Sequence, residues 1–175
     1  NSISSSIREI GDELQLINNL DDADGIKPGS IKYQWIRDNN NISGAVFHTY
    51  TIIDEDQGCI IRAKVTYTDN NNIQTSVSSY NTITVNNRPT GTVKIYYGNS
   101  ISSSIREIGD ELQLINNLYD ADGINTNSIK YQWIRDNNDI SGAVSDTYTI
   151  VDEDQGCIIR AKVTYTDNKG TQENV

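Results

Sequence analysis

Two short acidic segments hold the residues best suited to chemistry. The sequence DADG occurs at residues 22–25 and again at residues 120–123 of the 175-residue chain. Alternating aspartates before a glycine turn can present hard oxygen atoms to Ca²⁺, which takes about six to eight of them. Aspartate and glycine are also common in polar turns that bind nothing, so a calcium site and a plain turn both stay open. The candidate calcium ligands are Asp22, Asp24, Asp120 and Asp122.

Other carboxylates are available to complete such a site. They are the acidic tripeptides 54–56 and 152–154 and the single aspartates Asp69 and Asp167. Their spacing alone does not show that they converge on the DADG segments. The tripeptides also precede a glycine in the pattern D-x-G, which predicts a turn leading into a strand.

The two cysteines, Cys59 and Cys157, occupy equivalent positions in two copies of a repeated sequence. We expect them to lie about 30 Å or more apart, the length of one stacked β-sandwich. A disulfide needs Cα atoms closer than about 7 Å, so an intrachain disulfide is excluded. Two interpretations remain open: small half-buried apolar residues, or thiols that cross-link separate exported chains.

The sequence contains no recognisable catalytic set. Its single histidine, His48, is replaced by Asp146 in the second copy. No serine or cysteine stands in a nucleophile motif with a base beside it. We therefore expect that the chain is not an enzyme.

The charge of the chain limits its partners. The sequence has 14 Lys and Arg against 24 Asp and Glu, a net charge of −10. Such a chain repels the phosphate backbone, which excludes nucleic acid as a partner. No apolar run approaches the roughly 18 residues of a transmembrane helix, so we expect no membrane insertion.

The dominant feature of the sequence is an internal repeat with an offset of 98 residues. When residues 1–77 are laid over residues 99–175 without gaps, 64 of 77 positions are identical. Most of the differences fall in segments typical of turns, such as 27–29 and 47–48. Near-identical tandem copies are typical of repeat arrays, and we expect the chain to be a fragment of a longer one.

Alternating apolar residues predict an all-β fold. Residues 31–35 and 59–67 alternate with the period of a strand, and no stretch of ten or more residues has the apolar period of a helix. Trp35 and Trp133 lie mid-strand, where we expect core packing. Short strands separated by frequent polar turns predict a β-sandwich for each copy.

We predict two domains, residues 1–87 and residues 88–175. The segment Asn86–Gly91 resembles a linker because it is polar and contains proline and glycine. Strands are expected at Tyr80–Val85 before it and at Thr92–Tyr97 after it. From the comparison of the copies, we expect the first domain to lack its first strand and the second to lack its last.

Short segments along nearly the whole chain share a common pattern: Pro89–Gly91, Gly11 with Leu14, Asp22–Gly25, Tyr33–Trp35, Ile42–Ala45, Thr49–Ile52 and Asp54–Gly58, each of the last six repeated 98 residues later. Together these motifs resemble the bacterial immunoglobulin-like repeats that occur in tandem in very large secreted surface proteins and adhesins. The resemblance implies two tandem immunoglobulin-like β-sandwiches, a spacer or adhesive stalk outside the cell, and no catalysis. The chain departs from the family pattern at its two cysteines, where family members often have a polar residue.

The first functional hypothesis is therefore a non-catalytic structural or spacer segment of an extracellular surface, adhesin or fibre-forming protein. Its partners would be neighbouring repeats or copies of itself. Two alternatives stay open. One is a module that binds a glycan or a protein receptor through the variable loops Lys27–Gly29 and Phe47–His48. The other is a filament subunit that exchanges strands, as exposed sheet edges allow.

Overall fold

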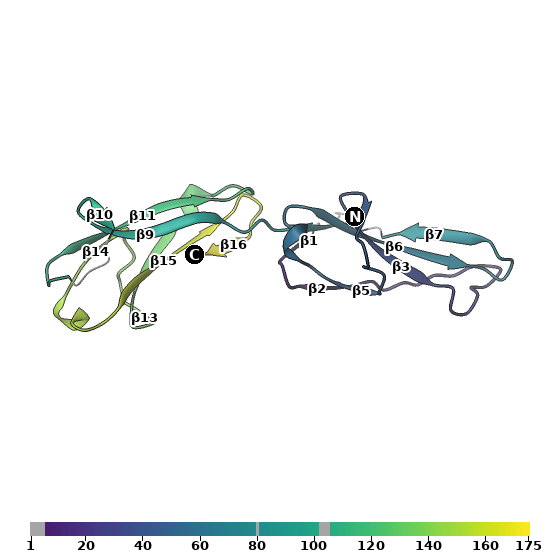
Figure 1. Cartoon of the computed structure of the whole chain (residues 1–175), viewed down its shortest axis with the longest axis horizontal. Coiled ribbons are helices and arrows are strands. Elements are labelled where there is room, and N and C mark those ends of the chain that lie inside the picture. The colour runs from purple at the N-terminus through teal and green to yellow at the C-terminus, as the bar shows by residue number, and fades with distance from the viewer. Residues whose placement is uncertain (1–5, 80, 102–105) are drawn as a thin grey trace. The chain divides into compact units, whose positions relative to one another are not determined.

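The computed structural model describes residues 6–79, 81–101 and 106–175 (Figure 1). Regular structure in this part of the chain consists of β-strands and three short 3₁₀ turns, which confirms the predicted all-β class. The strand expected from Tyr80 begins at Ile83, and Tyr80 itself lies outside the described residues. The 3₁₀ turns are η1 (Asp54–Asp56), η2 (Thr126–Ser128) and η3 (Asp152–Asp154).

The chain divides into two compact units, Asn1–Asn87 and Arg88–Val175. In the first unit, strands β1, β8, β6, β3 and β4 form one sheet in that order, β7 also pairs with β6, and β2 pairs with β5 in a second sheet. All these pairs are antiparallel except β1 with β8, which is parallel. The strands are β1 (Ser6–Arg8), β2 (Glu13–Gln15), β3 (Lys32–Arg37), β4 (Asn40–Asn41), β5 (Thr49–Thr51), β6 (Ile60–Thr68), β7 (Gln74–Ser78) and β8 (Ile83–Val85).

Strand β6 shows why the sequence folds in this way. Its residues alternate between the core and the surface, as expected for a strand with one face buried. Ile61, Ala63, Val65 and Tyr67 are buried, whereas Ile60 is exposed. Residues of both sheets close the core of the first unit, which consists of Leu14, Trp35, Ile52, Ile61, Ala63 and Val85.

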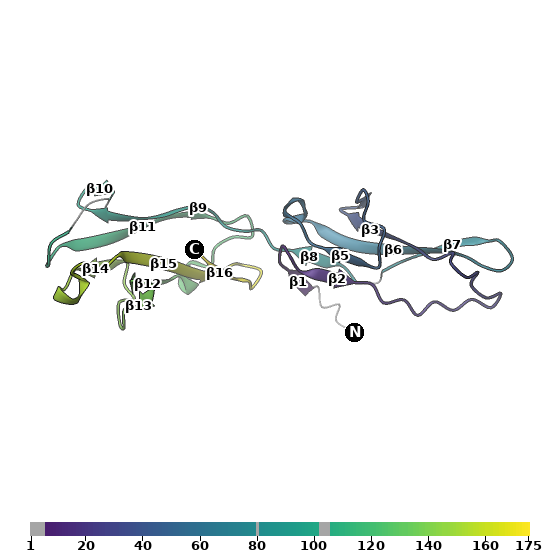
Figure 2. The ribbon, with the colours of Figure 1, turned by 60° about the horizontal axis from the view of Figure 1, so that its bottom comes forward.

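The second unit is built from two four-stranded antiparallel sheets, β10-β9-β11-β14 and β13-β12-β15-β16. Figure 2 shows the layer containing β9 and β11 facing the layer containing β15 and β16. Residues of both layers, including Leu112, Leu114 and Trp133, form its core. The strands are β9 (Thr90–Tyr97), β10 (Ser100–Ile101), β11 (Glu111–Tyr119), β12 (Lys130–Arg135), β13 (Asn138–Asp139), β14 (Thr147–Thr149), β15 (Ile159–Thr166) and β16 (Gln172–Asn174).

The segment between the units is shorter than the sequence indicates. Strand β9 begins at Thr90, two residues before the expected start at Thr92. Seven residues of β9 pair with β11, starting from Thr90 opposite Tyr119. Thr90 and Gly91 therefore belong to the sheet and not to a linker.

Candidate metal centre

The second DADG segment forms a tight turn. The backbone N–H of Asp122 donates to Oδ1 of Asp120 at 2.8 Å, and the N–H of Gly123 donates to the carbonyl of Asp120 at 3.0 Å. Gly123 has φ of +83°, in the left-handed region that favours glycine. The first unit repeats the turn, with the N–H of Asp24 3.0 Å from Oδ1 of Asp22.

The end of β15 brings another carboxylate to this turn. An isolated antiparallel bridge pairs Asp167 with Ile124, directly after the DADG segment. Oδ1 of Asp167 accepts the backbone N–H groups of Lys169 at 2.9 Å and Thr171 at 2.7 Å. These bonds fix the aspartate in a buried position beside the turn.

Three buried carboxylates meet here in the second unit. One carboxylate oxygen from each of Asp120, Asp167 and Glu173 lies within 4.8 Å of the others. The exposed fractions of these residues are 5%, 2% and 9%. Buried carboxylates are costly unless a proton, a hydrogen-bond donor or a cation compensates their charge. Such a group of oxygens has the chemistry that hard cations prefer.

The first unit contains a similar group of three carboxylates that is more exposed to solvent. Carboxylate oxygens of Asp22, Asp24 and Asp69 lie within 4.8 Å of one another. Asp69 is buried, Asp22 is half-buried and Asp24 is exposed. Thr75 stands opposite Tyr67 in the sheet, where the second unit has Glu173 opposite Tyr165.

Three of the four candidate calcium ligands thus lie in one of the two groups of three neighbouring carboxylates. Asp22 and Asp24 join Asp69, and Asp120 joins Asp167. Asp122 is placed differently: its Oδ1 lies 2.6 Å from Nζ of Lys169 in an ion pair. Metal binding by the four residues remains a prediction.

Sequence reasoning missed Glu173. The residue lies in β16, whose pattern of exposed Gln172, buried Glu173 and exposed Asn174 is that of an alternating strand. The alternation could have placed Glu173 inward. The three residues of this strand are all polar, however, and only Val175 follows them, so the acidic residue resembled an ordinary surface position.

A tyrosine hydroxyl holds the central aspartate of each group. The hydroxyl of Tyr165 donates to Oδ2 of Asp120 at 2.6 Å, and that of Tyr67 donates to Oδ2 of Asp22 at 2.8 Å. Burial and then the hydrogen bond to Asp120 raise the pKa of Tyr165, with further contributions from Glu173 and Asp167. The phenol therefore stays protonated and orients the carboxylate of Asp120.

The acidic tripeptides serve another purpose. Asp154 of η3 accepts hydrogen bonds from Nε of Arg135 at 2.7 Å, the hydroxyl of Tyr148 at 2.8 Å and the N–H of Val151 at 2.8 Å. Arg135 and Tyr148 come from opposite sheets, so Asp154 ties the layers together. Burial works to raise the pKa of Asp154, but these three hydrogen bonds outweigh it and lower the pKa. Asp56 makes the equivalent bonds in the first unit.

Both cysteines are free and half-buried. Burial and a hydrogen bond to Asp38 raise the pKa of Cys59, and a hydrogen bond to Asp136 followed by burial raises the pKa of Cys157. A raised pKa keeps the thiol protonated, whereas a nucleophilic cysteine requires the thiolate. Cross-linking between separate chains remains a prediction.

The variable loop at Phe47 is anchored through its main chain. The indole N–H of Trp35 donates to the carbonyl of Phe47 at 3.0 Å, and that of Trp133 donates to the carbonyl of Ser145 at 2.9 Å. The bond is the same in both units although the side chains differ. The ring of Phe47 itself is 70% exposed.

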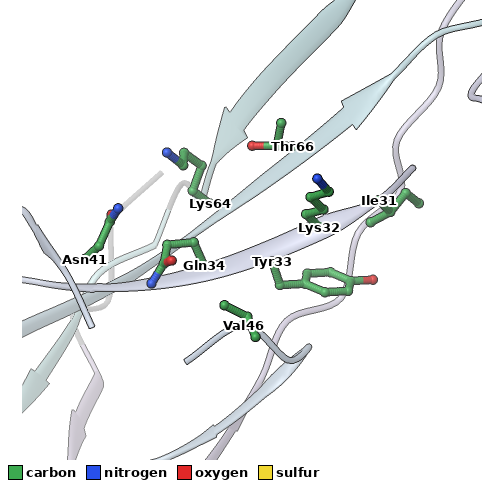
Figure 3. A pocket seen from close by; sticks show the side chains of 8 residues that line it. All are labelled: Ile31, Lys32, Tyr33, Gln34, Asn41, Val46, Lys64 and Thr66. Atoms are coloured by element: carbon green, nitrogen blue, oxygen red, sulfur yellow. The ribbon is translucent and has the colours of Figure 1, made fainter. Parts of the chain in front are cut away.

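A hollow lies beside this loop on the first unit. Figure 3 shows Lys32 and Lys64 on neighbouring strands, with the ring of Tyr33 directed away from them. Tyr33 is the one aromatic residue in a lining of Ile31, Lys32, Tyr33, Gln34, Asn41, Val46, Lys64 and Thr66. In the second unit, Asp139 replaces Asn41 and forms an ion pair with Lys162 at 3.8 Å.

Comparisons with known proteins give a weak structural likeness and no match to a family model or a curated protein. Among solved structures, the chain is similar to SGBP-B of the Bacteroides ovatus mixed-linkage glucan utilization locus, solved in complex with a mixed-linkage heptasaccharide. The TM-score is 0.31 at 10% identity, over 99% of this chain and 42% of that chain. The chain therefore spans less than half of that protein, and a likeness at this TM-score carries no argument about function.

Among the described residues, no helix is long and apolar enough to cross a membrane.

Proposed function

We propose that the chain is a non-catalytic structural segment of an extracellular or cell-surface repeat protein, and that its two units act as immunoglobulin-like links. Neighbouring repeats of the same protein, or copies of it, are its partners in this role. The resemblance of its sequence motifs to bacterial immunoglobulin-like surface repeats supports the location outside the cell.

One observation carries the proposal: in both units an aspartate and a tryptophan at equivalent positions are engaged in holding parts of the fold together. Asp56 and Asp154 accept three hydrogen bonds each, from an arginine, a tyrosine and a backbone amide. The tryptophan N–H groups anchor the loops at residues 47 and 145. A catalytic group needs a free face toward substrate, whereas these groups face the fold.

Stretching single molecules of the whole chain tests the proposal. A mechanical link resists force until a unit unfolds and then lengthens abruptly. Units of 87 and 88 residues should each release about 300 Å, at roughly 3.6 Å per residue. We expect two such events per molecule.

Extension without resistance would contradict a load-bearing role. The binding-module alternative predicts a different result: saturable binding to a purified glycan or receptor that is lost in the double variant Phe47→Ser, His48→Asp. This variant installs the residues that the second unit carries at these positions, so its fold should be retained.

A further inference from the structure

The buried acidic group of the second unit is the feature that the structural function leaves unexplained. Asp120, Asp167 and Glu173 are each more than nine-tenths buried. Carboxylates so close together repel one another strongly when water is excluded. Some positive charge or proton must compensate them for the fold to be stable.

Asp167 supplies a second, independent observation. Its Oδ1 accepts two backbone N–H groups, but its Oδ2 is buried and has no hydrogen-bond partner among the described residues. The hydroxyl oxygen of Thr171, whose backbone amide bonds the same carboxylate, is likewise buried without a partner. Buried oxygens without partners are rare in native structures and commonly mark an ion or water.

Lys169, a basic residue beside the group, is engaged with another carboxylate. Nζ of Lys169 lies 2.6 Å from Oδ1 of Asp122, the acidic residue that does not belong to the group. Tyr165 and the amide of Asp122 each donate one hydrogen bond to Asp120. These bonds orient the carboxylate of Asp120, and each of its oxygens still has a lone pair for a further contact.

We propose that the second unit binds one Ca²⁺ ion between the carboxylates of Asp120, Asp167 and Glu173. Oxygens on opposite sides of a calcium ion, each about 2.4 Å from it, are about 4.8 Å apart. The separations within the group lie inside that limit. An all-oxygen, anionic set selects a hard cation over zinc or copper. The proposal does not depend on the structural function, because it is argued from the carboxylates alone.

The first unit provides a natural comparison. It has Thr75 in place of Glu173 at the same register position, and its Asp24 is exposed. A site with fewer buried anionic ligands binds calcium more weakly. The whole chain should therefore take up one ion tightly, in the second unit.

The test is calorimetric titration of the metal-free whole chain with Ca²⁺ alone. We expect one saturable site in the wild-type chain. Glu173→Gln keeps the side-chain volume and removes one anionic ligand, so the affinity should fall about tenfold or more. Asp69→Asn is the matched control in the first unit and should leave the tight site unchanged. Circular dichroism of each variant checks that it is folded.

A gain-of-function variant makes the test independent of any loss of folding. Thr75→Glu places a carboxylate opposite Tyr67, as Glu173 stands opposite Tyr165. We expect it to add a second binding event. No saturable uptake by the wild-type chain at millimolar Ca²⁺ would overturn the proposal. Unchanged affinity in folded Glu173→Gln, or an unchanged single site in folded Thr75→Glu, would overturn it as well.

Discussion

Asp154 receives hydrogen bonds from three separate parts of its unit: strand β12, strand β14 and the start of its own 3₁₀ turn. Charge-assisted hydrogen bonds of this kind are roughly twice as strong as neutral ones. They stabilise the ionised carboxylate in the folded state and lower its pKa. The unfolded chain lacks these bonds, so folding and ionisation of Asp154 are linked.

This linkage predicts a loss of stability in acid. The pKa of Asp154 is lower in the folded state than in the unfolded state, where it is about 3.9. Its contribution is therefore fully present above about pH 4 and is lost as the pH falls through the folded value. Urea unfolding followed by tryptophan fluorescence at pH 7, 4 and 3 should show a weaker acid dependence in Asp154→Asn than in wild type.

The control for this prediction is Asp152→Asn, an exposed residue of the same turn. It removes the same charge and should retain the acid dependence of the wild-type chain. Equal acid dependence of all three proteins would contradict the role assigned to Asp154.

Among the elements, the central strands were the best predicted from sequence. The alternation at residues 59–67 placed Ile61, Ala63, Val65 and Tyr67 on one buried face, and the structure confirms all four. Cys59 was expected on the same face, but it precedes β6 and is only half-buried. Alternation is reliable in such strands because one face packs against a core and the other meets water.

In strand β9, the backbone at Gly91 lies very close to the backbone of β11, and this contact leads to a testable prediction. Gly91 has φ of +97°, and a Cβ there would collide with the backbone carbonyl of Asn117 in β11. Gly91→Ala should therefore destabilise the second unit by more than backbone strain alone, which is about 1–3 kcal/mol. Thermal and urea unfolding of the variant measure the loss.

Gly109→Ala separates the two effects. Gly109 has φ of +93°, but a Cβ there meets nothing within 4 Å. Gly109→Ala should lose only the stability that corresponds to the backbone strain. Gly91→Ala should lose clearly more, because the collision with Asn117 adds to the strain. Similar losses in both variants would mean that the strands can move apart at no cost.

Other pairings could not be predicted from local sequence. Strand β1 pairs in parallel with β8, about 77 residues away in the chain, and no local pattern specifies a contact between such distant segments. The convergence of Asp120, Asp167 and Glu173 could not be predicted from local sequence either. The sequence suggested Asp120 and Asp167, but only the register of β15 against β16 brings Glu173 to them.

At the scale of the whole molecule, each hydrophobic core draws its residues from one unit. The core of the first contains Trp35 and that of the second contains Trp133. Trp133→Ala should cost about 3–5 kcal/mol in its own unit. The fluorescence of Trp35 should then still report the wild-type unfolding midpoint of the first unit.

The reciprocal variant, Trp35→Ala, is the matched control. It should leave unchanged the unfolding midpoint of the second unit, which the fluorescence of Trp133 reports. A shift of the remaining transition by several degrees in either variant would show that the two units stabilise each other.

The bond between the tryptophan N–H and the loop carbonyl has a practical consequence. Because Trp35 and Trp133 hold the main chain at residues 47 and 145, the side chains there are free to change without loss of the anchor. Foreign peptides could be grafted at these positions, and the chain would then display two different recognition sequences on one scaffold. Protein engineers could exploit the duplication by varying one loop while keeping the other as an internal reference.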